Sequence, residues 1–428
     1  MTTQTADLIQ FLNESPCNFL AVKNITDRLD RAGFTLLDMS DEWHLRPGDR
    51  HYIVKNSSAV FAFIVGDDPA AGFKIISAHS DSPGFRIKPN AEIVNEGGVV
   101  TLNTEVYGGP ILYTWFDRPL SISGRVILRG ESPLRPVTRL VNFYRPLLTI
   151  PHLAIHYNRT VNDGNPLSKQ RDMLPVLGRV SDKEEGKGLL TRMVAQELGA
   201  TTDEILDYDL TLYDTTPATL FGLNEEFISS GRIDDLEMAH AAVTAITGSA
   251  ANTPREAMTR VMAIFDNEET GSGTKQGAAS PILRAILQRL CGGFEVYSRA
   301  VANSFMVSAD NGHALHPNYP SKQDPTNHPI PGDGPVVKIN ANCKYMTDAR
   351  SAAVFRSICE RADVPCQVFV NHSDTAGGST LGNILTSQIE LDGVDMGAPQ
   401  WAMHSCRETA AVADHLSIIS AFTAFYDL

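Results

Sequence analysis

The stretch 260-RVMAIFDNEETGSG-273 joins a strand-like segment directly to a charged turn. Arg260–Phe265 is a short apolar run of the kind that forms a buried strand, and the sequence DNEE follows it at once. The adjacent carboxylates of Glu268 and Glu269 repel each other, so one of them holds a proton or a cation lies beside them. A divalent metal would be such a cation, with one glutamate binding it and the other free to move a proton. The alternative is a pair of ordinary solvated glutamates at a strand end.

Composition places the chain among globular proteins. With 428 residues it is long enough for two domains, or for one large domain with an insertion. The net charge of −14, without a basic cluster, argues against binding to nucleic acid or to an anionic membrane. No apolar run reaches membrane-spanning length. The first residues, MTTQTADLIQFLNESP, have neither a basic nor an apolar region, so we expect no signal peptide. Six scattered cysteines without a CxxC pair favour reduced thiols, and so a cytoplasmic protein.

Residues 1–88 have the pattern of the start of an α/β domain. Helical periodicity covers Thr5–Leu12 and Cys17–Ala32. Two short apolar runs follow, Ala59–Gly66 and Phe73–Ala78, and both predict strands.

The segment 89–230 has a different character, because β-branched and polar residues alternate there between glycines and prolines. This pattern predicts antiparallel strands in a β-rich insertion. From 231 to 428 helical and strand-like segments alternate again, ending with an expected helix at Ala410–Tyr426. We therefore expect one α/β domain in two pieces, 1–88 and 231–428, with a mostly parallel sheet and helices on both faces.

Three strand-like runs end in residues that can bind a metal. His79 and Asp81 follow the run that begins at Phe73, Glu268 and Glu269 follow the second run, and Asp310 follows a third. Ligand sites of open α/β sheets lie beyond the carboxyl ends of strands. Nitrogen and oxygen ligands without sulfur suit zinc, manganese or cobalt in a catalytic site.

Several other candidate metal ligands can also be interpreted as residues with a purely structural role. Asp234 and Glu237 have the spacing of a helix capping box, with Asp234 as the N-cap. His404 is a lone histidine in a polar loop. His313 and His316 are three residues apart, but a proline follows, so a pair of ligands on one helix is not expected.

Six segments resemble the aspartyl aminopeptidase family, a group of cytosolic zinc exopeptidases with two metal ions. They are SAHSDSPGFRIKP (77–89), IPHLAIHYNR (150–159), SGRIDDLEM (230–238), FDNEETGSG (265–273), SADNGHALHPNYP (308–320) and GAPQWAMHSCRE (397–408). The matching segments run in order through nearly the whole chain, so the resemblance is specific.

The resemblance implies a two-metal site. By this comparison His79 and Asp310 bind one metal ion, Glu269 and His404 bind the other, and Asp234 bridges both instead of capping a helix. A bridging carboxylate is typical of two-metal hydrolases. The expected cofactor is two Zn²⁺ ions per subunit, with Co²⁺ or Mn²⁺ as alternatives.

The resemblance also separates the two adjacent glutamates. Glu268 matches the general base, which takes a proton from the water activated by the two metals and passes a proton to the leaving amine. Asp81 matches a carboxylate that orients a ligand histidine. Because Glu268 and Glu269 then have different tasks in one site, the backbone must turn sharply, and Gly271 and Gly273 are expected to permit the turn.

The family removes N-terminal aspartate or glutamate from peptides. Lys338 matches a family lysine that faces the substrate carboxylate, with Lys344 as a nearby competitor. Tyr345 matches a tyrosine near the substrate, and Gly378, in TAGGST, is expected in a backbone wall of the pocket.

The resemblance further implies a homo-oligomer. In this family the inserted domain mediates dimer contacts, and dimers assemble into a dodecamer. His156 resembles a histidine that reaches the active site of a partner subunit and stabilises the tetrahedral oxyanion. The alternative is a histidine whose hydrogen bonds are made within the subunit interface and that has no part in the chemistry.

The residues alone leave two other functions open. One is another amide hydrolase on the same scaffold, such as a neutral aminopeptidase or an N-acyl amino acid deacylase, and Lys338 argues against it. The other is a catalytically inactive scaffold that keeps the fold and the oligomer. Glu268 beside the full ligand set argues against that.

Overall fold

The computed structural model describes residues 2–252 and 256–428. The chain divides into two compact units. The first comprises Met1–Asp81, Ala218–Met403 and Glu408–Leu428, and the second comprises Ser82–Pro217 and His404–Arg407.

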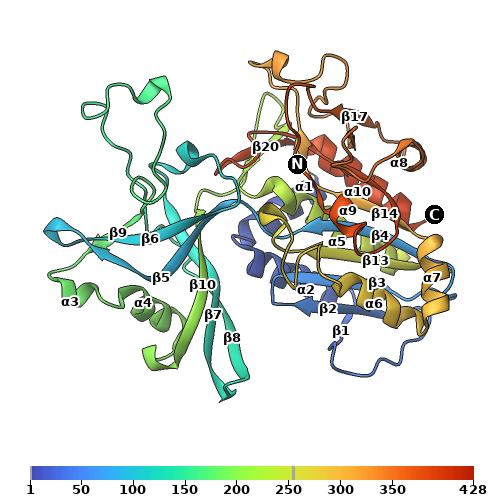
Figure 1. The fold of residues 1–428 in the computed structure, drawn as a ribbon, viewed down its shortest axis with the longest axis horizontal. Helices are drawn as coiled ribbons and strands as arrows, with labels where there is room; N and C mark the ends of the chain where they lie inside the picture. The colour runs from blue at the N-terminus through green and yellow to red at the C-terminus, as the bar shows by residue number, and fades with distance from the viewer. Residues whose placement is uncertain (1, 253–255) are drawn as a thin grey trace. The chain divides into compact units, whose positions relative to one another are not determined.

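The first unit is built around a mixed sheet (Figure 1). Among the described residues its order is β1-β2-β3-β13-β4-β14-β18-β16-β17. The strands are β1 (Thr35–Leu36), β2 (Arg50–Lys55), β3 (Ala59–Ile64), β4 (Phe73–His79), β13 (Thr259–Phe265), β14 (Phe305–Ala309), β16 (Val336–Ile339), β17 (Gln367–Val370) and β18 (Asp392–Gly397). The central strands β13, β4, β14 and β18 are parallel, as are β1 to β2 and β16 to β17. The predicted mostly parallel sheet is confirmed.

Strand β3 explains why helices must cover both faces of this sheet. All its residues are buried. Val60 and Ala62 belong to one hydrophobic core, whereas Phe61 and Phe63 belong to another. Successive side chains of a strand point to opposite faces, so a continuous apolar run needs cover on both.

Helices supply that cover. One core contains residues of α1 (Thr3–Glu14), α2 (Asn18–Arg31), α5 (Ile233–Asn252), α8 (Ala349–Arg361) and α10 (Val412–Tyr426). The other contains residues of α6 (Ile282–Cys291), α7 (Phe294–Ala302) and α9 (Leu381–Leu385). Helix α7, which the sequence analysis did not predict, buries Tyr297, Ala300 and Val301.

A smaller sheet completes the first unit. Its order among the described residues is β11-β12-β20-β19-β15. The strands are β11 (Thr219–Phe221), β12 (Phe227–Ser230), β15 (Gly312–His313), β19 (Pro399–Trp401) and β20 (Glu408–Ala411). Because β20 occupies residues up to Ala411, the closing helix begins at Val412 and not at Ala410 as predicted.

The second unit contains an antiparallel sheet, whose order among the described residues is β8-β7-β10-β5-β6-β9. The strands are β5 (Gly84–Val94), β6 (Val99–Tyr107), β7 (Leu120–Ser132), β8 (Arg135–Asn142), β9 (Val176–Arg179) and β10 (Ile205–Asp214). Helices α3 (Lys183–Gly186) and α4 (Leu189–Leu198) accompany it. In its core the rings of Phe85 and Trp115 meet edge to face, with centroids 5.0 Å apart. The β-rich insertion predicted from the sequence is confirmed.

The two units divide after Asp81 and after Pro217, whereas the sequence places boundaries after residues 88 and 230. Strand pairing accounts for the difference. Strand β5 pairs with β6 and β10 in the second unit, and β12 pairs with β20 in the first.

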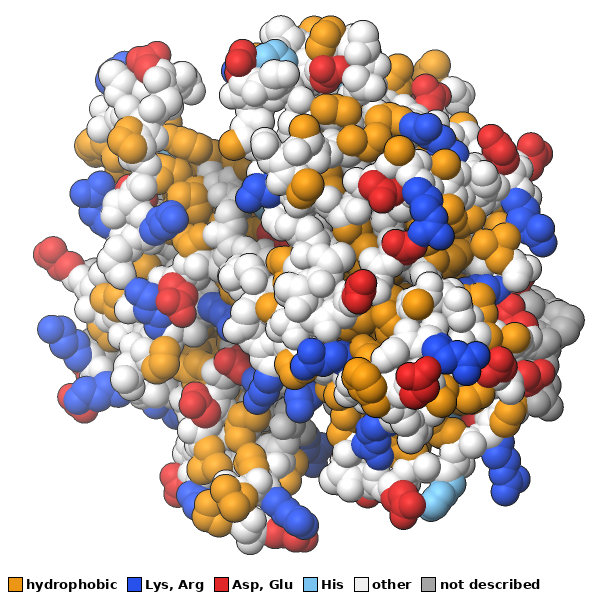
Figure 2. All heavy atoms as spheres, turned by 45° about the vertical axis from the view of Figure 1, so that its right-hand side comes forward, with side chains coloured by type: hydrophobic (Ala, Val, Ile, Leu, Met, Phe, Trp, Pro, Cys, Tyr) orange, Lys and Arg blue, Asp and Glu red, His pale blue; other side chains and the backbone are white. Residues whose placement is uncertain are grey.

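The surface carries mixed charge. On the face drawn in Figure 2, Lys and Arg side chains are interspersed with Asp and Glu side chains. In the part of the chain that the structure describes, every helix is too short or too polar to cross a lipid bilayer.

Candidate metal centre

Three neighbouring strands bring the metal-binding candidates to one edge of the sheet. Strands β13, β4 and β14 lie side by side and run parallel. Strand β4 ends at His79, and β14 ends immediately before Asp310. The turn after β13 carries Glu268 and Glu269.

His79 lies at the centre of a buried acidic cluster. Its Nε2 atom is 3.4 Å from Asp234 Oδ1 and 3.9 Å from Asp235 Oδ2. Ligand atoms of His79, Asp234, Asp235 and Asp310 all lie within 4.8 Å of one another. Because carboxylates that lie so close repel one another when charged, this arrangement favours a cation among them.

The two glutamates form a second group with the same histidine. Ligand atoms of His79, Glu268 and Glu269 also lie within 4.8 Å of one another. Both glutamates are half-buried. The structure therefore brings together predicted site residues from all three strand ends.

Asp81 connects the end of β4 to the glutamate turn. Its Oδ1 accepts the backbone N–H of Glu268 at 3.1 Å, and its Oδ2 accepts that of Glu269 at 3.2 Å. The Nδ1 atom of His79 lies 3.1 Å from the carbonyl oxygen of Asp81 and 3.3 Å from its Oδ1. With Nδ1 held in this way, the ring offers Nε2 to the acidic cluster.

The glutamate turn is sharp, as its sequence suggested. Asn267, Gly271 and Ser272 adopt positive φ angles of 61°, 92° and 60°. Gly271 tolerates this conformation because it has no Cβ. Gly273, to which the sequence analysis gave the same role, lies outside the positive-φ region.

The start of α5 does not form the capping box that its sequence suggested. The Asp234 N–H donates to Glu408 Oε2 at 3.0 Å, while Glu237 accepts from Asn311 Nδ2 at 2.8 Å. Asp234 has a non-helical φ/ψ of −77°/109°. The carboxylate of Asp234 faces the cluster, with Oδ1 3.4 Å from Nε2 of His79.

Burial and mutual repulsion control the protonation of the cluster. Burial raises the pKa of Glu268 to about 8, with Asp310, Asp234 and Asp81 adding to the shift against the opposing effect of His79. Burial lowers the pKa of His79, but the surrounding carboxylates outweigh it and the net shift is well upward. Without added positive charge the cluster therefore retains protons.

The donor set fits a zinc ion. Imidazole nitrogen and carboxylate oxygens are its usual catalytic ligands. Oδ1 of Asp235 is buried and has no hydrogen-bond partner among the described residues, although Oδ2 of the same carboxylate accepts the His79 N–H at 2.9 Å. A cation in the cluster would compensate such an oxygen.

Lys338 adds a positive charge next to Asp310. Its Nζ atom donates to the carbonyl oxygen of Asn311 at 2.8 Å and lies 3.4 Å from Asp310 Oδ1. The side chain is only 4% exposed. Burial lowers the pKa of Lys338, but Asp310 and Tyr345 outweigh this and the net shift is upward, so the amine stays charged.

The other substrate-side candidates differ in exposure. Tyr345 is buried, with its ring centroid 5.8 Å from Lys338 Nζ. Lys344, the sequence competitor of Lys338, is exposed. Gly378 is also exposed and has open space where a Cβ would lie.

The remaining two candidates, His404 and His156, belong to the second unit. His404 has a positive φ of 67°, and its Nδ1 lies 3.1 Å from the carbonyl oxygen of Gly109. His156 is exposed in a turn.

Asp235 is a buried member of this centre that the sequence did not single out. Its position next to Asp234 was the available signal. Glu237 has the spacing of a capping residue, but it is buried and accepts a hydrogen bond from Asn311.

A buried cluster of a histidine and carboxylates at the carboxyl ends of parallel strands has the donor set of a catalytic metal site. The family model for the aminopeptidase I zinc metalloproteases (M18) matches residues 11–426. The chain therefore belongs to the M18 family, as the sequence resemblance predicted, and is a zinc aminopeptidase of that family.

Individual relatives agree with this assignment. The probable M18 family aminopeptidase 2 of Clostridium novyi (strain NT) is 47% identical, over 99% of this chain and 98% of the relative. A chain from the cryo-EM structure of the Ape4 and Nbr1 complex superposes with a TM-score of 0.95 at 35% identity, covering 99% of this chain and 85% of that one. The S. cerevisiae mApe1 dodecamer gives a TM-score of 0.85 at 25% identity, with 98% and 95% covered.

Proposed function

We propose that this aminopeptidase releases N-terminal aspartate or glutamate from peptides with the help of two metal ions. The observation that carries the acidic specificity is Lys338, a buried, charged amine beside Asp310 in a chain of net charge −14. Burying an ammonium group is costly unless it is paired. A substrate carboxylate would add a second partner to the one that Asp310 provides.

The proposed ligands follow the sequence resemblance. His79 and Asp310 hold one ion, Glu269 and His404 hold the other, and Asp234 bridges them. When bound, zinc ions polarise a scissile carbonyl and lower the pKa of water. Zn²⁺ is the family's metal, and Co²⁺ or Mn²⁺ would suit the same donors.

Glu268 is the proposed general base. In this role it takes a proton from the attacking water and delivers a proton to the leaving amine. Asp81 holds Glu268 in place through the backbone and orients His79.

Further proposals concern the environment of the site. Tyr345 and Gly378 line the substrate side. His156 serves the active site of a partner subunit within a homo-oligomer, and a dodecamer is supported by the S. cerevisiae mApe1 dodecamer among the similar structures. We propose a cytoplasmic location, where reduced thiols such as these are stable.

The test of acidic specificity compares substrates and a matched pair of lysine variants. Asp-, Glu- and Leu-p-nitroanilide are assayed with the zinc-loaded wild type, Lys338→Met and Lys344→Met. We expect the wild type to prefer Asp and Glu, and Lys338→Met to lower that preference about 10–100-fold, the effect of one charged hydrogen bond. The exposed Lys344 should have little effect.

Three outcomes would contradict the proposal. A preference for Leu would indicate a neutral aminopeptidase, and cleavage of N-acetylated amino acids in place of free N-termini would indicate a deacylase. Absence of turnover on all substrates in the zinc-loaded protein would favour an inactive scaffold.

A further inference from the structure

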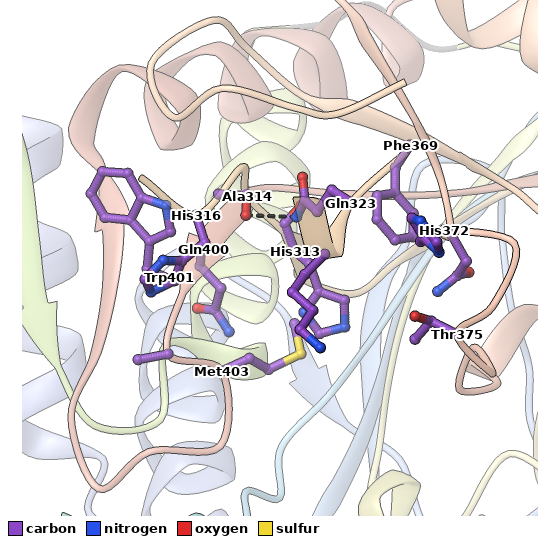
Figure 3. A pocket seen from close by; sticks show the side chains of 13 residues that line it. His313, Ala314, His316, Gln323, Phe369, His372, Thr375, Gln400, Trp401 and Met403 are labelled. Carbon is purple, nitrogen blue, oxygen red and sulfur yellow. Dashed lines mark hydrogen bonds between the residues drawn. The ribbon is translucent and has the colours of Figure 1, made fainter. Parts of the chain in front are cut away.

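A cavity of about 240 Å³ in the first unit plays no part in the proposed chemistry so far (Figure 3). Its lining residues come from β15 and the segment after it, from β19 and the residues after it, and from the end of β17 and the loop that follows. They include His313, His316, His372, Phe369, Trp401 and Met403.

The cavity lies next to the proposed site of the first substrate residue. Phe369 is the register partner of Lys338 on adjacent strands. Gly312, which precedes His313, approaches Lys338, because a Cβ on this glycine would lie 3.6 Å from Lys338 Cε. Adjacent strands are about 4.8 Å apart and an extended peptide advances about 3.4 Å per residue, so the cavity lies within a few peptide residues of Lys338.

The charged side chain in the lining, Lys322, has the sign opposite to the net charge of the chain. The whole sequence has 50 acidic and 36 basic residues. Among the described lining residues there are three histidines and Lys322, and no aspartate or glutamate. A cavity with this composition favours an anion against the overall field of the protein.

Two of the histidines offer a hydrogen-bond donor even when neutral. Nδ1 of His316 accepts the backbone N–H of Asn318 at 3.2 Å, and Nδ1 of His372 accepts that of Asp374 at 3.2 Å. A neutral imidazole that accepts at Nδ1 carries its proton on Nε2. The Asp374 carboxylate is 4.0 Å from Nδ1 of His372 and 94% exposed, so it faces the nitrogen that is already occupied.

The donors are spread along the cavity. Figure 3 shows His316 on the side of Trp401 and His372 on the side of Phe369, with His313 between them. The ring centroid of His313 is 6.0 Å from that of Phe369. Among the described residues these histidines form no group compact enough to hold a metal. Separated donors between apolar walls suit carboxylates on flexible aliphatic stems.

We propose that this cavity is a subsite for carboxylates of the peptide downstream of the scissile bond, so that the enzyme favours substrates with further acidic groups after the first residue. The inference rests on the proposed function, because it assumes a peptide held at the metal centre. The carboxylate can come from an acidic side chain at the second or third position, or from the C-terminus of a short peptide.

The test uses four peptides that begin with Asp. Asp-Ala-Ala-amide is neutral downstream, Asp-Glu-Ala-amide and Asp-Ala-Glu-amide carry one side-chain carboxylate, and Asp-Ala-Ala with a free C-terminus carries a terminal one. For the zinc-loaded wild type we expect kcat/KM to be about tenfold higher with at least one of the three anionic peptides than with the neutral one, mainly through KM. The anionic peptide that gains most identifies the source of the carboxylate.

Histidine variants connect this preference to the cavity. His316→Ala and His372→Ala should reduce the anionic-to-neutral ratio of kcat/KM toward one, while His372→Gln, which keeps an N–H donor, should retain part of it. His44→Ala is the matched control, because this histidine has an 81% exposed side chain outside the cavity lining. Thermal unfolding of each variant identifies any change that comes from misfolding.

A wild-type ratio near one for all peptides would overturn the inference, and so would cavity variants that leave a high ratio unchanged. These outcomes are separable from failure of the proposed function. First-residue preference is measured on anilides, which have no downstream peptide, and it depends on Lys338 and not on the histidines.

Discussion

The carboxylate of Asp81 accepts the backbone N–H of Glu269 at 3.2 Å, and its other oxygen accepts that of Glu268 at 3.1 Å. The same side chain lies 3.3 Å from Nδ1 of His79. One carboxylate thus joins the end of β4 to the turn after β13, two segments that are far apart in sequence. The metal-binding and proton-transfer candidates are positioned together, because both depend on Asp81.

Replacing Asp81 with asparagine should therefore weaken zinc binding. An asparagine has one acceptor oxygen, so its NH₂ group would face one of the two backbone N–H donors. We expect zinc affinity to fall about 10–100-fold, the usual effect of losing a residue that orients a ligand. Competition with a fluorescent chelator measures it. Asp68→Asn, which alters a carboxylate that accepts the Ala70 N–H, is the control and should keep the wild-type zinc affinity.

Glu268→Gln separates proton transfer from metal binding. The amide cannot act as a base, so kcat should fall about 10²–10⁴-fold. Zinc content, measured by atomic emission after dialysis, should stay at the wild-type ratio, because Glu269 and not Glu268 is the proposed ligand. Wild-type turnover in this variant would exclude Glu268 as the base.

Asp234→Asn decides between a bridging ligand and a helix cap. A bridging carboxylate serves both ions, so the variant should lose zinc and activity together. Loss of a cap would lower the free energy of unfolding by about 1 kcal/mol and leave the zinc content unchanged. Zinc analysis and urea unfolding on the same sample distinguish the two results.

Sequence patterns predicted the alternating strands and helices well where burial is strong. Strands β3, β4 and β13 are continuous apolar runs because both faces are covered, and this pattern is visible without a structure. The three strand ends that carry site residues were visible for the same reason.

The contacts between segments far apart in the chain could not be predicted from the sequence. Strand β18 lies inside the main sheet, between β14 and β16, yet DGVDMG has a buried Asp395 and two glycines that hide its strand character. Asp395 is tolerated there because it accepts the Met346 N–H at 2.6 Å and the Thr380 hydroxyl at 2.7 Å. Likewise the partners of Asp234 and Glu237 are supplied by residues distant in sequence, so spacing alone favoured a capping box.

The ion pair and hydrogen bonds of Asp7 should make a contribution to the free energy of unfolding that is lost in acid. Its carboxylate accepts hydrogen bonds from the two terminal guanidinium nitrogens of Arg28, at 2.7 and 2.8 Å, and lies 3.0 Å from Nε2 of the buried His240. The hydrogen bond with His240 is the main cause that lowers the pKa of Asp7, and Arg28 adds to it. Asp7→Asn should lower the free energy of unfolding by about 1 kcal/mol at pH 7. The effect is no larger because the side chain is 38% exposed and solvent screens its charge.

The sign of the pH dependence follows from that lowered pKa. Below about pH 4 the unfolded state binds a proton at Asp7 before the folded state does, so this contribution is present above pH 4 and is lost as the pH falls further. Urea unfolding of wild type and Asp7→Asn should give a constant difference from pH 6 to 8 that shrinks below pH 4. Asp27→Asn, which removes an exposed pair with Lys23, should cost less than about 0.5 kcal/mol.

Removal of zinc should lower stability in a pH-dependent way. A ligand that binds only the folded state stabilises it by about 2.7 kcal/mol at a free concentration one hundred times its Kd, so dialysis against a chelator should lower Tm and added zinc should restore it. In the zinc-free protein burial raises the pKa of Glu268 to about 8, so the folded state binds more protons than the unfolded state between about pH 4 and 8. Its stability should therefore fall as the pH rises through this range. Zinc should remove most of this slope, because a cation in the cluster favours the charged carboxylates; an equal slope with and without zinc would mean that the cluster does not hold the metal.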